Sequence, residues 1–277
     1  NVNNNWYTNF STKWCFEFTL NTISIIKKNN AESFKKISKE LNLQKKEIDF
    51  WLKISKNIYL NEDKKLRVFV QQDGFFDKEL NEVDKLDCSE RPLNQNWSWD
   101  RILRSPYIKQ ADVLQGIYFF EDKFDIKSIK SNYEFYQKFT VHESSLSPCI
   151  HSIIACKLGK TKSAYELFKR ASRLDLDDYN KELNEGLHIT SMAGSWLAIV
   201  EGFAGMRVKN NSLHFSPNLP EDWEELIFNI TFRENIYKIK VKKSLFQCSL
   251  NSNQKCNIYV DNKKLKFDKN GKASISI

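Results

Sequence analysis

Residues 185–208, EGLHITSMAGSWLAIVEGFAGMRV, contain the point at which the sequence changes from a helical to a β pattern. Upstream of Gly205, apolar residues recur at the spacing of amphipathic helices. Downstream of it, apolar and polar residues alternate in short runs separated by turn residues. We therefore expect a mainly α part over residues 1–207 and an all-β C-terminal domain over residues 208–277.

Both parts can be divided further into predicted elements. Helices are predicted over residues 31–41, 47–58, 109–120, 126–139, 148–158, 163–174 and 191–203, after an apolar stripe that ends near residue 30. Strands are predicted over residues 213–215, 226–232, 236–241, 245–250, 258–260, 265–267 and 273–277. Paired helices of varied length are typical of a toroid of helical hairpins, and short strands with turns between them are typical of a sandwich. The long aromatic stretch between Leu60 and Tyr107 has no clear period, and such loops are usually functional.

Composition and charge exclude several classes of protein. The 277 residues are 41% hydrophobic and 28% charged, which is typical of a globular chain, and no run of apolar residues is long enough for a membrane span. The net charge is +8, and the ten Lys and two Asp of residues 236–277 supply all of it. Among them, Lys238, Lys240 and Lys242 alternate with apolar residues on a predicted strand. The segment lacks the arginines and exposed aromatics that nucleic acids favour. We expect no membrane or nucleic-acid partner.

The six cysteines have neither the spacing of a metal site nor that of a disulfide framework. Free buried thiols favour a reducing compartment, and a cytoplasmic location is therefore expected.

The first of three polar segments opens a predicted helix. Lys109, Gln110 and Asp112 stand there in apolar company, close in sequence to Trp97 and Trp99. Each polar residue alone has a structural interpretation, since an acidic residue favours a helix start and a lysine can point into water. The three together, beside aromatic faces of the kind that pack on sugar rings, favour a polar binding site.

The second polar segment is residues 142–148, HESSLSP. Ser147 before Pro148 is typical of a helix start, with Ser147 as N-cap and Pro148 at the first helical position. Capping explains Ser147, but it does not explain the four polar residues from His142 to Ser145. Successive hydroxyl groups and free backbone N–H groups at a helix start favour an anion.

The third polar segment, residues 185–196, combines small residues with His188. Small residues permit close packing of backbone on backbone, and a lone histidine there is more often structural than chemical. His151 and His214 also have structural interpretations. Taken together, however, the three segments indicate a polar pocket for an anion and a hydroxyl-rich ligand.

Three strings carry a resemblance to a known family: WSWDRILRSPYIKQADVLQGIYFFED (97–122), FTVHESSLSPCIHSI (139–153) and the stretch 185–208 quoted above. They resemble glycoside hydrolase family 65, and within it the maltose and kojibiose phosphorylases. The resemblance covers nearly the whole chain in order and is weakest in the β tail. It implies the second part of an (α/α)6 catalytic barrel, followed by a small C-terminal β-sandwich.

The resemblance also implies the chemistry: inverting cleavage of an α-glucosidic disaccharide by inorganic phosphate, which gives β-glucose 1-phosphate and glucose. The implied sugar-binding residues are Lys109 and Gln110, and the implied phosphate-binding residues are Ser144, Ser145, His188 and Thr190. Phosphate is then a co-substrate, no cofactor or metal is expected, and a homodimer is expected because the family is often dimeric.

The resemblance places the general acid, a Glu of a PDE-type motif, directly ahead of a segment similar to residues 1–9, and therefore outside this sequence. Two alternatives stay open. Glu143 would be the general base of an inverting α-glucosidase of kojibiose type, because an inverting hydrolase needs a second carboxylate to activate water. The chain would otherwise be a non-catalytic sugar-binding fragment. The match to maltose-phosphorylase strings favours the phosphorylase.

Overall fold

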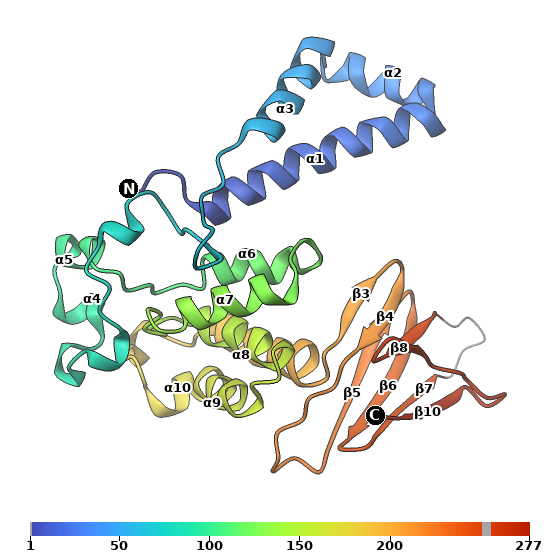
Figure 1. Ribbon diagram of the computed structural model, residues 1–277. Coiled ribbons are helices and arrows are strands. Elements are labelled where there is room, and N and C mark those ends of the chain that lie inside the picture. The colour runs from blue at the N-terminus through green and yellow to red at the C-terminus, as the bar shows by residue number, and fades with distance from the viewer. Residues whose placement is uncertain (1, 251–255) are drawn as a thin grey trace.

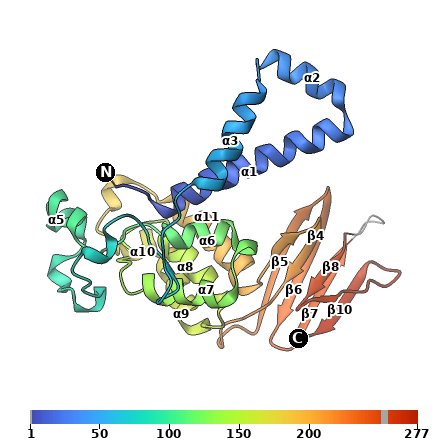
Figure 2. The ribbon, with the colours of Figure 1, turned by 45° about the horizontal axis from the view of Figure 1, so that its top comes forward.

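The computed structural model describes residues 2–250 and 256–277, so Asn1 of the N-terminal segment lies outside the described residues. The chain forms a helical part followed by a β part (Figure 1). It starts with α1 (Trp6–Asn29), α2 (Ala31–Glu40) and α3 (Lys45–Asn57). In both views these helices project as an arm from the rest of the helical part (Figures 1 and 2).

The irregular stretch before Tyr107 holds only short elements. They are β1 (Glu62–Asp63), β2 (Val68–Phe69), 3-10 turns at Phe75–Asp77, Val83–Lys85 and Cys88–Glu90, α4 (Leu93–Asn96) and α5 (Trp99–Arg104). Buried polar groups of α7 fix this stretch, because Asn132 Oδ1 accepts from Phe69 N–H and Tyr136 Oη accepts from Gln71 N–H, both at 2.9 Å.

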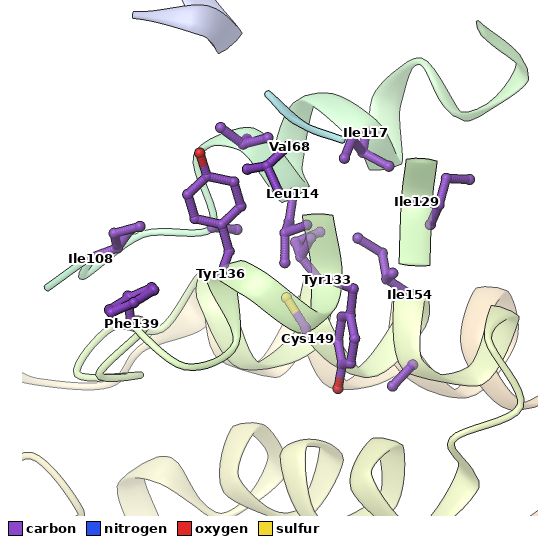
Figure 3. Packing of buried hydrophobic residues seen from close by; sticks show 14 of the residues in the cluster. Val68, Ile108, Leu114, Ile117, Ile129, Tyr133, Tyr136, Phe139, Cys149 and Ile154 are labelled. Atoms are coloured by element: carbon purple, nitrogen blue, oxygen red, sulfur yellow. The ribbon is translucent and has the colours of Figure 1, made fainter. Parts of the chain in front are cut away.

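The remaining helices pack together. They are α6 (Val113–Phe119), α7 (Ile126–Tyr136), α8 (Ser147–Lys157), α9 (Thr161–Ser172), α10 (Leu174–Asp177) and α11 (Ile189–Leu197), which continues as a π-helical segment, Ala198–Phe203. Successive helices from α6 to α9 run in opposite directions (Figure 1). Figure 3 shows the apolar side chains between α6, α7 and α8, among them Leu114, Tyr136 and Ile154. α8 is central, since every residue from Ser147 to Cys156 is buried.

Gly194 determines how closely α11 approaches α8. A Cβ atom at Gly194 would lie 2.7 Å from Cys149 Sγ, well inside van der Waals contact. The absence of a side chain therefore lets the two helices pack backbone against side chain.

Two sequence predictions about helix starts were wrong. The helix predicted from Lys109 begins at Val113, because Asp112 adopts φ +43° and its carboxylate accepts hydrogen bonds from Asn5 Nδ2 (3.1 Å) and Gln71 Nε2 (2.7 Å). Ser147 lies inside α8 rather than at its N-cap, and its Oγ bonds instead to His142 Nδ1 at 3.1 Å.

Within the described residues, the β part consists of two four-stranded sheets. One has the order β10 (Lys272–Ser276), β7 (Leu245–Leu250), β6 (Asn235–Lys242), β5 (Glu225–Phe232); the other has the order β3 (Arg207–Lys209), β4 (Ser212–Phe215), β8 (Ile258–Val260), β9 (Lys263–Lys264). The first sheet is antiparallel throughout, and β4 pairs with β8 in parallel. The fold is thus mainly α with an all-β C-terminal region, as predicted.

Alternation along β6 follows the sequence pattern. Tyr237, Ile239 and Val241 are buried between the sheets, whereas Lys238 and Lys242 are exposed. The strand predicted over residues 265–267 was wrong: the nearest strand is β9, and Leu265 is buried just after it. β3 was missed, because its three residues, Arg-Val-Lys, contain a single apolar position.

Across the described residues, no helix combines the length and apolarity that a membrane crossing requires.

Candidate functional site

The three polar segments lie at one end of the helical part. α6 and α8 run the same way, and their first turns face the end at which α4 and α5 lie (Figure 1). The loop before α11 reaches the same end, since Glu182 Oε1 lies 3.4 Å from Asn94 Nδ2 of α4. Residues 109–110 precede α6, residues 144–145 precede α8, and residues 188–190 are at the start of α11. The fold therefore gathers residues that are up to 81 positions apart in sequence.

Backbone pairing brings the first two segments together. Ile108 N–H donates to Phe139 C=O at 2.8 Å, and Val141 N–H donates to Ile108 C=O at 3.0 Å. Ser144 then donates its hydroxyl proton to Gln110 Oε1 at 2.8 Å, and its oxygen accepts from Leu146 N–H at 3.1 Å. Ser144, which is expected to bind phosphate, and Gln110, which is expected to bind sugar, are thus joined by a hydrogen bond.

Glu143 has both carboxylate oxygens occupied within the protein. Arg91 Nε donates to Oε1 at 2.8 Å, and Leu93 N–H donates to Oε2 at 2.7 Å. The side chain of Glu143 is only 4% exposed. Arg91 also donates from Nη2 to the carbonyl of Val141. The ion pair therefore joins the irregular stretch to the backbone just before Ser144.

His142 is held in a strained backbone conformation beside this pair. It has φ +55°, which costs free energy for a non-glycine residue and persists only where neighbours enforce it. Arg170 Nε donates to the carbonyl of His142 at 3.0 Å. The His142 ring contacts Ser147 Oγ through Nδ1 at 3.1 Å and Gln137 Nε2 through Nε2 at 3.3 Å. Burial, with His151, Arg170 and Arg91 nearby, holds the pKa of His142 well below its usual range. Both ring nitrogens of His142 thus have partners within the protein, in the turn that precedes Ser144.

His188, at the start of α11, lies between two carboxylates. Its Nδ1 lies 2.5 Å from Asp175 Oδ1, and its Nε2 lies 3.6 Å from Glu182 Oε2. The hydrogen bond from His188 is the main cause that lowers the pKa of Asp175. Glu182 in turn lies 3.4 Å from Asn94 Nδ2, which links this cluster to α4.

Three other predicted site residues have side chains without a polar partner among the described residues. Within residues 2–250 and 256–277, the side chains of Lys109, Ser145 and Thr190 form no hydrogen bond or ion pair, and Lys109 and Thr190 are exposed. Their polar groups are therefore available to a ligand.

The two tryptophans expected to offer apolar faces differ. The Arg101 guanidinium lies 3.5 Å from the centre of the Trp97 ring, and Trp97 Nε1 donates to Glu90 Oε1 at 3.1 Å. Trp97 also lines an open cavity of about 480 Å³ with Tyr107. Trp99 is 74% exposed. One face of Trp97 is thus already covered, and Trp99 is open to solvent.

Three residues that shape the site were missed by sequence reasoning: Arg91, Arg170 and Asp175. Arg91 lies in the aperiodic stretch, and Arg170 lies on an otherwise ordinary amphipathic helix. Asp175 is one of three aspartates within residues 175–178. Each acts through a partner 13 to 52 positions away, and no local pattern shows such pairs.

Comparison with known proteins gives matches along most of the chain. The description "Glycosyl hydrolase family 65 central catalytic domain" matches residues 1–197, and "Glycosyl hydrolase family 65, C-terminal domain" matches residues 206–267. Maltose phosphorylase of Bacillus subtilis is 50% identical over 94% of this chain and 34% of its own length. Kojibiose phosphorylase of Halothermothrix orenii is 32% identical over 92% of this chain and 33% of its own length.

A solved structure agrees with the same assignment. A putative kojibiose phosphorylase from the human microbiome superposes with a TM-score of 0.89 at 37% identity, over 100% of this chain and 36% of that one. The chain thus spans about a third of the length of these relatives. On the family matches, which cover more than half of its residues, the chain belongs to glycosyl hydrolase family 65.

Proposed function

We propose that the chain is part of an inverting phosphorylase that cleaves a maltose- or kojibiose-type α-glucosidic disaccharide with inorganic phosphate. The observation that carries this proposal is the engagement of Glu143. A hydrolase would need a second carboxylate free to activate water, about 6.5–9.5 Å from the acid. The carboxylate of Glu143 is buried and held by Arg91 and Leu93 N–H, which disfavours that role.

The proposed roles follow from the groups that the site offers. Lys109 and Gln110 bind hydroxyl groups of the glucosyl unit. The phosphate is held by Ser144, Ser145, His188 and Thr190, at the starts of α8 and α11, where helix N-termini favour an anion. The bond between Ser144 and Gln110 supports a site in which anion and sugar are adjacent.

In the proposed reaction, a phosphate oxygen forms a bond to the anomeric carbon on the face opposite the glycosidic oxygen. The glycosidic bond breaks, and the leaving oxygen takes a proton from the general acid that the family resemblance expects upstream of residue 1. The products are β-glucose 1-phosphate and glucose. Proximity of the two substrates in one pocket supplies much of the rate enhancement.

The proposed enzyme has domains at residues 1–207 and 208–277, works as a homodimer and acts in the cytoplasm. The start of β3 at Arg207 supports this proposed boundary. The six free cysteines support a reducing compartment.

The test is to incubate the full-length protein with maltose, kojibiose, nigerose and trehalose, with and without phosphate. Cleavage of one disaccharide only when phosphate is present is the expected result. Cleavage at an equal rate without phosphate would refute the proposal. The residue assignments are tested by His188→Ala and Ser144→Ala, which should raise the KM for phosphate far more than the KM for disaccharide. Lys109→Ala should raise both, because we place Lys109 between sugar and anion. An unchanged ratio in all of these variants would remove the phosphate site.

A further inference from the structure

Asp175 is bonded twice to one residue of the candidate site. Its Oδ1 lies 2.5 Å from His188 Nδ1, and its Oδ2 accepts from His188 N–H at 2.9 Å. Asp175 belongs to the single turn α10, and His188 starts α11, so this pair closes the loop between the two helices. The side chains are 13% and 20% exposed, so the contact is largely shielded from solvent.

This contact fixes the imidazole of His188. A carboxylate only accepts hydrogen bonds, so Nδ1 must carry the proton that bridges to Asp175. The second bond, to the backbone N–H, prevents the ring and the start of α11 from moving apart. Nε2, which lies 3.6 Å from Glu182 Oε2 and so outside normal hydrogen-bond distance, is the ring nitrogen left to meet a ligand. It can donate to an anion when the ring carries a second proton, and its position is set by the contact with Asp175.

We propose that Asp175 is a positioning residue for phosphate, which orients His188 so that Nε2 faces the anion. This inference rests on the proposed phosphorylase function and adds a residue to its site. Asp175 does not touch the phosphate; it acts through the orientation of the His188 ring. Its loss should therefore weaken phosphate binding and leave the sugar-binding residues Lys109 and Gln110 as they are.

The same turn provides a matched control. Asp177, two residues further on, accepts from Arg173 Nε at 2.7 Å and from Arg173 Nη2 at 2.6 Å. Both aspartates of α10 thus accept two hydrogen bonds, but Asp177 pairs with Arg173, which lies between α9 and α10, and not with His188. A general disturbance of α10 should follow from either substitution, whereas a loss of phosphate binding should follow only from Asp175.

The experiment uses the full-length protein and the variants Asp175→Ala, Asp175→Asn and Asp177→Ala. KM for phosphate, KM for disaccharide and kcat are measured, together with the Kd of inorganic phosphate by calorimetry without sugar. Hydrogen bonds to charged groups are worth enough to predict a rise of about tenfold or more in KM and Kd for phosphate in Asp175→Ala. Asp175→Asn, which keeps one acceptor and the fold, should show a smaller rise. The KM for disaccharide in both, and every constant in Asp177→Ala, should stay within about twofold of wild type, the scale of a lost exposed contact.

Three outcomes would overturn the inference. One is a phosphate KM and Kd within twofold of wild type in both Asp175 variants. The others are an equal rise in both KM values, and a matching effect of Asp177→Ala. Each of these leaves the proposed function intact if the wild type needs phosphate. A wild type that cleaves disaccharide without phosphate overturns the proposed function, and the inference with it.

Discussion

Replacing Arg91 by Met should destabilise the helical part strongly. The substitution keeps an apolar stem and removes the guanidinium, so the buried carboxylate of Glu143 keeps only the Leu93 N–H as a donor, and the Val141 carbonyl loses its partner. Breaking a buried ion pair by removing one partner costs about 3–5 kcal/mol. Because Arg91 itself is 29% exposed, water reaches its side of the pair, and we expect a cost near the lower limit.

The assay is urea unfolding followed by the helical circular dichroism signal. A cost of about 3 kcal/mol with a slope of about 3 kcal/mol/M shifts the midpoint down by about 1 M. The control is Arg104→Met, which breaks a pair whose side chains are 80% and 73% exposed and should cost at most about 0.5 kcal/mol.

A double variant separates the lost pair from the lost side chain. Glu143→Gln keeps an oxygen for Leu93 N–H and removes the buried charge, so Arg91→Met with Glu143→Gln should be about 1–2 kcal/mol more stable than Arg91→Met alone. If Arg91→Met matches Arg104→Met, or if the double variant is the less stable one, Glu143 is not held by a buried pair. The case against a free catalytic base at this position would then fail.

Burial lowers the pKa of His151 to about 3 and keeps that of His142 well below 6.5. The unfolded chain therefore binds more protons at acidic pH, and stability should be full above about pH 6.5 and fall below it by up to about 1.4 kcal/mol per pH unit for each histidine. Urea midpoints against pH measure this, and a slope that stays the same in His151→Leu would contradict it. Gly194→Ala places a Cβ 2.7 Å from Cys149 Sγ and should cost about 1–3 kcal/mol by overpacking; an unchanged urea midpoint would show that α11 and α8 are less closely packed.

Local patterns were sufficient for the fold class but not for the starts of α6 and α8. Period and alternation predicted the helical and β parts, because burial of one face imposes those patterns. Asp112 ends up outside α6 because its partners, Asn5 and Gln71, are 107 and 41 positions away. Ser147 was assigned to capping, but His142 provides a competing partner that only the folded turn brings near.

In the candidate site, too, local features could be predicted from the sequence, whereas contacts between distant residues could not. The clustering of polar residues at helix starts could be seen in the sequence, and the family resemblance supplied their roles. The distinction between phosphate and water as attacking group depends on Glu143, whose partner Arg91 is 52 positions away. An ion pair at that separation leaves no local signal, so the sequence left both reactions open.

The central claim is that phosphate, and not water, attacks the glucosyl unit. The most direct measurement is cleavage of the preferred disaccharide in water enriched in oxygen-18 with unlabelled phosphate, with early samples analysed by mass spectrometry. We expect glucose 1-phosphate without the heavy isotope, because its anomeric oxygen comes from phosphate. Free glucose labelled at the anomeric oxygen, formed at the same rate whether or not phosphate is present, would contradict it.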